Sequence, residues 1–167
     1  LAAGTPAGVA ATMSYMAIYV VMTIGAFACI LQMRDADGRP VESIASLAGL
    51  SQSRKGLAAA FAIFMFSMAG IPPLFGFWAK FLVFDAAVAA DLTALAAFGI
   101  AASVIGAFYY LKIIKTIYFD EPAAAYEAKG GMVENVILTA CAVVIVFGYL
   151  LNPALDAVSA AAAASLF

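Results

Sequence analysis

The middle of the apolar segment 57–90 reads Gly70-Ile71-Pro72-Pro73-Leu74-Phe75-Gly76. A proline has no backbone N–H, and its ring clashes with the carbonyl four residues earlier. Pro72 and Pro73 are therefore predicted to leave the carbonyls of Met68 and Ala69 without helical partners. Glycines on both sides permit backbone angles that a regular helix excludes. The motif predicts a break between two shorter helices.

The length of the segment 57–90 sets how many times it can cross a membrane. A continuous helix of this length would extend about 51 Å, whereas the hydrocarbon core of a bilayer is about 30 Å thick. Two crossings would need about 40 residues and a turn. We therefore expect one crossing made of two half-helices, 57–69 and about 76–90, broken at 70–73. Such a break is tolerated only inside protein or beside a water-filled cavity.

The whole chain has the composition of a membrane protein. Its 167 residues are 66% hydrophobic and 11% charged, with a mean hydropathy of +1.07. Soluble domains average about 45–50% apolar and about 25% charged residues. Charge-free runs of about 20 residues predict the remaining spans. We expect an all-α membrane protein with about four transmembrane helices, over roughly 9–33, 57–90, 92–119 and 133–151, and a short surface helix over 154–167.

Several classes of site and partner are disfavoured by composition. The chain has no histidine, which removes the commonest metal ligand and the usual general base. Cys29 and Cys141 are too few and too far apart for an iron–sulfur cluster or a thiolate zinc site. The net charge of −2 argues against a nucleic-acid partner. The first residue is Leu1 rather than Met, so we expect a processed product or the C-terminal piece of a longer protein.

The distribution of basic residues predicts the orientation. Seven of the eight lie in or beside the loops 34–56 and 120–132, namely Arg34, Arg39, Arg54, Lys55, Lys112, Lys115 and Lys129. The positive-inside rule makes these loops cytoplasmic and both ends of the chain periplasmic. A single crossing by 57–90 places the two loops on one face, as the rule requires.

Lys80 is the eighth basic residue, and it lies among aromatic and aliphatic residues one turn after Gly76. A charge at bilayer depth costs about 2.5–3.5 kcal/mol on insertion scales, which makes it a functional candidate. Burial disfavours the charged ammonium, and a lysine, unlike an arginine, can lose its proton. Lys80 is therefore predicted to relay protons. The alternative is that Lys80 ends a span at 57–79 and snorkels to the interface, with Trp78 in an aromatic belt.

The helix 92–119 carries two further features. Lys112 and Lys115 lie three residues apart on one face, close to Tyr109. They are predicted to anchor the cytoplasmic end of the span, and a secondary proton path through these three residues is the alternative. The small residues Gly99, Ser103 and Gly106 predict close packing against a neighbouring helix.

Three stretches together resemble the antiporter-like subunits of bacterial respiratory complex I, most closely the N type. They are 67–81, which holds Gly70, Pro72, Pro73, Gly76 and Lys80; the loop 37–50, with Asp37-Gly38-Arg39-Pro40-Val41-Glu42; and the helix 106–119, with Tyr109-Tyr110-Leu111-Lys112. The resemblance implies a fold of fourteen transmembrane helices with two inverted five-helix repeats. This chain would hold the last four helices.

The same resemblance implies a function. A subunit of this kind conducts protons across the inner membrane as electrons pass from NADH to quinone, and Lys80 would lie near the proton exit. The implied partners are the other membrane subunits, the missing N-terminal part of the subunit and lipids. FMN, iron–sulfur clusters and quinone would be bound elsewhere in the complex, with no cofactor in this chain. Two alternatives remain open: a cation/proton antiporter subunit of the Mrp type, and a membrane scaffold that conducts no ions.

Overall fold

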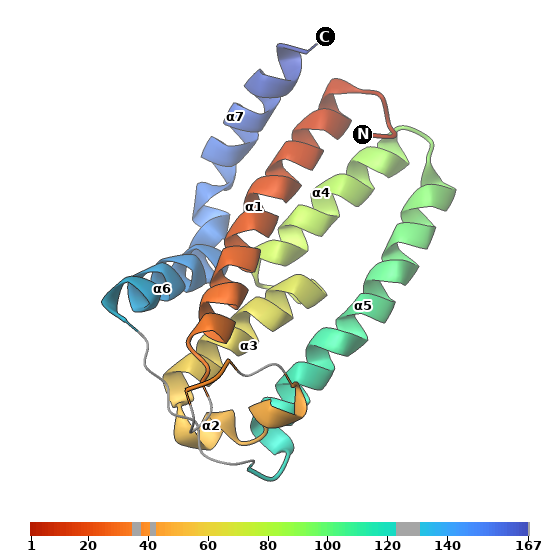
Figure 1. The fold of residues 1–167 in the computed structure, drawn as a ribbon. Coiled ribbons are helices and arrows are strands. Elements are labelled where there is room, and N and C mark those ends of the chain that lie inside the picture. Colours follow the sequence, from red (N-terminus) through yellow and green to blue (C-terminus); the bar gives the residue numbers. More distant parts are fainter. Residues whose placement is uncertain (35–37, 41–42, 123–130, 167) are drawn as a thin grey trace.

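A computed structural model describes residues 1–34, 38–40, 43–122 and 131–166, and helices dominate this part of the chain (Figure 1). The longer helices are α1 (Pro6–Leu31), α3 (Lys55–Ala69), α4 (Phe75–Ala89), α5 (Thr93–Phe119), α6 (Met132–Phe147) and α7 (Asn152–Ala164). The short ones are η1 (Ala45–Leu47), α2 (Leu50–Ser53) and η2 (Gly148–Leu151). Asp37, Val41, Glu42 and Lys129, which entered the sequence predictions, lie outside the described residues.

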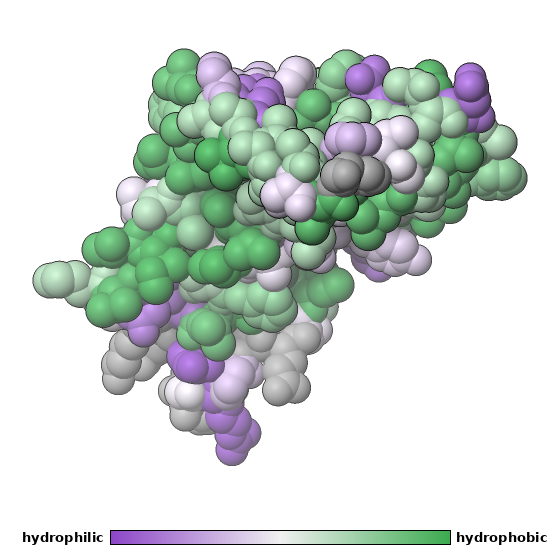
Figure 2. Space-filling model, turned by 90° about the horizontal axis from the view of Figure 1, so that it is seen from above, coloured by the Kyte–Doolittle hydropathy of each residue, from purple (hydrophilic) through white to green (hydrophobic). Residues whose placement is uncertain are grey.

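Among the described residues, three helical stretches are long and apolar enough to cross a membrane: Pro6–Leu31, Thr93–Phe119 and Met132–Ala164, the last containing α6, η2 and α7. α3 is a shorter apolar helix. Hydrophobic side chains also cover most of the face shown in Figure 2, with hydrophilic ones gathered in a few groups near its edges. The prediction of an all-helical membrane protein is confirmed.

Local sequence explains where α3 ends and α4 begins. Gly70 has a φ of +84°, and its N–H bonds to the carbonyls of Phe66 and Ser67, which caps α3. This left-handed conformation is strained for residues with a Cβ, and glycine adopts it freely. Leu74 is extended before α4 starts at Phe75. The chain 70–74 thus separates two apolar helices.

α1 lies in the centre of the helix packing and contacts α3, α4, α6 and α7, whereas α5 packs on α3 and α4 (Figure 1). The buried core includes Met22 and Cys29 of α1, Phe61 and Phe64 of α3, and Ile145 of α6. α5 instead exposes large apolar side chains such as Phe98 and Ile105. Such a surface suits contact with lipid or with further protein.

In the C-terminal segment, where a span over 133–151 and a short surface helix over 154–167 were expected, the structure has α6, η2 and α7. α6 gives way to η2 at Gly148, and α7 then runs along α1 (Figure 1). The buried hydroxyl of Ser14 donates a hydrogen bond of 2.9 Å to Ser159 Oγ. Pro153 stands in the first turn of α7, where a proline is tolerated, and the small residues of 159–164 allow close approach to α1.

Candidate functional site

Lys80 lies in the second turn of α4, and its side chain extends back over the gap between α3 and α4. Its Nζ donates hydrogen bonds to the carbonyls of Met68 (2.8 Å) and Ala69 (3.2 Å) and to Ser103 Oγ on α5 (2.6 Å). The two carbonyls are those that Pro72 and Pro73 deprive of helical partners. Lys80 thus supplies hydrogen-bond donors to two backbone carbonyls that have no helical partners.

The surroundings of the Lys80 ammonium are polar without being acidic. Its three acceptors are neutral oxygens, and within the described part of the chain it has no carboxylate in salt-bridge range. The C-terminal end of α3 carries the negative end of the helix dipole, which favours a cation there. A lysine held in this way is stabilised by dipoles rather than by a fixed negative charge, so it retains the capacity to lose its proton.

Two cavities meet at Lys80. One, of about 310 Å³, lies towards α1 and is lined by Tyr15, Tyr19 and Tyr110, among others. The other, of about 550 Å³, lies between α4 and α5 and includes Asp85 in its wall. Lys80 and Ser103 line both cavities. The pair therefore stands at the boundary between the two spaces.

Ser67 of α3 and Gly76 of α4 join these two helices close to Lys80. The amide of Gly76 donates to Ser67 Oγ at 3.0 Å, and the Ser67 hydroxyl donates to Met22 Sδ of α1 at 3.0 Å. This hydroxyl satisfies one of the free amides that begin every helix. It also fixes the start of α4 against both α3 and α1.

Tyr149 of η2 closes the other side of the break. Its hydroxyl donates a hydrogen bond of 3.1 Å to the carbonyl of Leu74, and its ring packs against Phe75 and Trp78. Sequence reasoning treated Ser103 as a packing residue and missed Ser67 and Tyr149. The sequence signal that could have identified both residues is a hydroxyl group within an otherwise apolar span.

Removal of the Tyr149 hydroxyl tests how much its hydrogen bond to the Leu74 carbonyl stabilises this region. We expect Tyr149→Phe to lower the free energy of unfolding by about 1 kcal/mol, because the Leu74 carbonyl loses a partner while the ring contacts persist. Thermal denaturation of the solubilised complex that contains the full-length subunit measures the change. Tyr118→Phe, on the exposed end of α5, is the matched control; equal effects of the two substitutions would argue against the closure.

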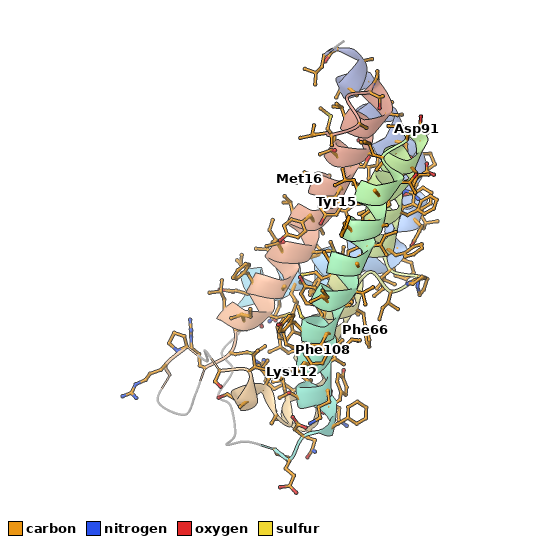
Figure 3. All side chains as sticks on the ribbon, turned by 90° about the vertical axis from the view of Figure 1, so that its right-hand side faces the viewer. Tyr15, Met16, Phe66, Asp91, Phe108 and Lys112 are labelled. Atoms are coloured by element: carbon orange, nitrogen blue, oxygen red, sulfur yellow. The ribbon has the colours of Figure 1, made fainter. Side chains whose placement is uncertain are left out.

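Lys112, Lys115 and Tyr109 lie apart from the Lys80 site. All three are exposed, and neither cavity at Lys80 includes them among its described lining residues. Lys112 lies near the end of α5 opposite to Asp91 (Figure 3). Lys115 pairs with Asp120, and this hydrogen bond holds the pKa of the Asp120 carboxyl below its usual value. Their position suits anchors at the polar end of the helix.

Within the residues that the structure describes, the acidic and cysteine side chains do not gather around the Lys80 site. Over 1–34, 38–40, 43–122 and 131–166, no group of three or more His, Cys, Asp or Glu side chains converges to form a metal site. What the chain does place together is an amine, a hydroxyl and two backbone carbonyls. This set can hold and exchange a proton.

Comparison with known proteins identifies relatives of the whole chain. NADH-quinone oxidoreductase subunit N of Rhizorhabdus wittichii is 66% identical over 100% of this chain and 35% of the relative. The subunit N of Sphingopyxis alaskensis is 57% identical over 100% of this chain and 36% of the relative. The chain therefore spans about a third of the length of these relatives.

Solved structures resemble the fold. A chain of respiratory complex I from Thermus thermophilus with bound aureothin matches with a TM-score of 0.77 and 27% identity, over 89% of this chain and 34% of that chain. A chain of the Mrp complex from Dietzia sp. DQ12-45-1b matches with a TM-score of 0.84 over 99% of this chain and 39% of that chain. At 23% identity, the second match concerns the fold alone.

The family model described as "NADH:quinone oxidoreductase/Mrp antiporter, TM" matches residues 1–106. This region includes α1, the break between α3 and α4, Lys80 and Ser103. The match covers more than half of the chain, and the relatives named above cover all of it. The chain therefore belongs to the NADH:quinone oxidoreductase/Mrp antiporter transmembrane family.

Proposed function

We propose that the chain is the C-terminal part of a proton-conducting membrane subunit of NADH:quinone oxidoreductase, with Lys80 as its proton relay. One observation carries the proposal: Lys80 Nζ is held by three neutral oxygens at the boundary between two cavities. Relatives that match the entire chain bear the name of subunit N of this enzyme. The other membrane subunits and the rest of the same polypeptide are then its partners in the bacterial inner membrane.

The proposed topology has four crossings. We infer that α3 and α4 together make one crossing interrupted at 70–74, because each alone is only about 22 Å long. α1, α5 and Met132–Ala164 supply the other three. Figure 1 draws both chain ends at one end of the helices and α2 at the other, which supports periplasmic ends and cytoplasmic loops 34–56 and 120–132.

In this proposal the proton moves by exchange at Lys80 Nζ. Neutral Lys80 accepts a proton from water in the cavity next to Tyr15 and Tyr19, and the ammonium is then held by the Met68 and Ala69 carbonyls. It releases the proton to water in the cavity next to Asp85, nearer the end of α4. Ser103 can donate to the neutral amine and accept from the ammonium, so its hydroxyl serves both states.

Two other functions are less well supported. An Mrp-type antiporter subunit shares the fold, but the relatives at 57–66% identity are named as NADH-quinone oxidoreductase subunits. A non-conducting scaffold with a snorkelling lysine fits poorly with the inward contacts of Lys80 to Met68, Ala69 and Ser103. Copurification of the full-length subunit with NADH dehydrogenase subunits would support the proposed function. Sodium-dependent transport in the absence of those subunits would instead support the Mrp-type antiporter.

Ser103 gives a direct test of the relay geometry. We expect Ser103→Ala to slow proton transfer through this subunit about tenfold, because Lys80 loses the partner that serves both protonation states. Ser103→Thr keeps a hydroxyl and should retain most of the activity. Acidification of inverted membrane vesicles by the complete complex measures the effect, with complex content verified in parallel. Normal proton transfer by an assembled Ser103→Ala complex would contradict this role.

A further inference from the structure

A second cavity system lies away from Lys80, between α3 and α6. It has a volume of about 600 Å³ and begins beside Gln32, where α1 ends, and Arg54, which precedes α3. It continues between apolar side chains of the two helices, including Leu57, Ala60, Ile63, Leu138, Ala142 and Val146. The lining residues 135–147 of α6 extend over about 18 Å. Asn135 and Thr139 of α6 add two polar side chains to the lining, and the remainder of the space is apolar.

Two hydrogen-bond donors at the polar end lack acceptors among the described residues. Gln32 is only 2% exposed, and its Nε2 has no partner there; the same holds for Nη1 of Arg54. A buried donor without a partner costs about 1–3 kcal/mol, and more when it is charged. Both atoms have almost no accessible surface, so an occupant with acceptor oxygens removes this cost when the two side chains turn towards the cavity.

The charge at the polar end selects the kind of occupant. Arg54 is the only charged side chain among the described lining residues, so the site favours an anion. A guanidinium and an amide N–H₂ are well suited to phosphate oxygens. The apolar remainder of the cavity, between α3 and α6, suits a hydrocarbon chain.

We propose that the space between α3 and α6 is a binding site for an anionic phospholipid. On binding, the Arg54 and Gln32 side chains turn towards the cavity and donate to the phosphodiester oxygens, and one acyl chain lies along Leu57, Ile63 and Ala142. The side of α6 is open towards the bilayer, where Val143 and Phe147 are more than half exposed. Basic pockets between transmembrane helices on the cytoplasmic side bind such headgroups in membrane proteins. The lipid would join the end of α1 to α3 and α6.

Lipid capture by the complete complex tests this site. The purified complex is placed in phosphatidylcholine nanodiscs that contain a photoreactive phosphatidylglycerol, and labelled peptides of this subunit are quantified. We expect labelling in 135–147 to fall about tenfold in Arg54→Gln, because the phosphate loses its charged partner. Lys55→Gln, which removes the adjacent exposed cation outside the cavity, should change labelling by about twofold or less.

A second variant separates binding from folding. Ala142→Trp fills the apolar part of the cavity and leaves both donors in place, so it should also abolish labelling while the complex assembles. Equal labelling by photoreactive phosphatidylcholine would overturn the proposal, as would equal effects of Arg54→Gln and Lys55→Gln. Unchanged labelling of Ala142→Trp would overturn it too, as would an Ala142→Cys variant that cross-links to another protein segment in place of lipid.

Discussion

Replacing Lys80 with methionine in the full-length subunit is expected to stop proton transfer through that subunit while the complex still assembles. Methionine fills a similar volume but carries no proton, so the boundary between the two cavities loses its exchangeable group. A positioned proton-transfer group contributes about 100-fold or more to rate, and we expect a decrease of this order. The rate at which inverted vesicles acidify should fall by the part that this subunit contributes, and coupled NADH oxidation should slow.

The Lys80 test needs a variant that separates proton exchange from structural support. Lys80→Arg keeps a cation and donors for the Met68 and Ala69 carbonyls, but a guanidinium does not release its proton at physiological pH. The relay hypothesis therefore predicts that Lys80→Arg assembles and still fails to transfer protons. Lys55→Met, an exposed lysine at the start of α3, is the control. Wild-type transfer by Lys80→Arg would refute the relay role and favour a structural cation.

The largest expected loss of stability comes from Gly76→Ala. A Cβ at Gly76 would lie 2.2 Å from the Ser67 carbonyl oxygen, 2.6 Å from Ser67 Oγ and 2.8 Å from Met22 Sδ. The nearest atom belongs to the backbone, so a side-chain rotation cannot relieve the clash. We expect a loss of about 3 kcal/mol, the upper part of the range for overpacking. The assembled complex should show a lower Tm and a smaller yield.

Gly106→Ala is the matched control for Gly76. Gly106 lies within α5 and also lines the cavity beside Lys80, but a Cβ there meets no atom within 4 Å. Alanine in a helix interior is more favourable than glycine by about 0.5–1 kcal/mol, so this variant should be neutral or slightly more stable. If the two substitutions destabilised the complex equally, close packing of Gly76 would not explain the effect.

Most of the fold could be anticipated because its causes are local. Charge-free runs of sufficient length predict helices that cross a membrane, and the structure confirms the all-helical membrane class. The covalent geometry of Pro72 and Pro73 predicts which carbonyls lose their partners, and these same carbonyls accept from Lys80. The packing of the C-terminal segment on α1 could not be predicted, because a run of alanines carries no local signal for the helix that it will contact.

Sequence alone thus identified a bilayer protein, a proline-broken segment and one lysine in an apolar setting, since each follows from residue chemistry along the chain. Only the tertiary structure joined Lys80 to Ser103, Gly76 to Ser67, and Tyr149 to Leu74. A helix that is apolar on every side has no polar face to indicate which side is buried. The partners of its few hydroxyl groups are therefore decided by how the helices pack, and this packing places Lys80 between two cavities.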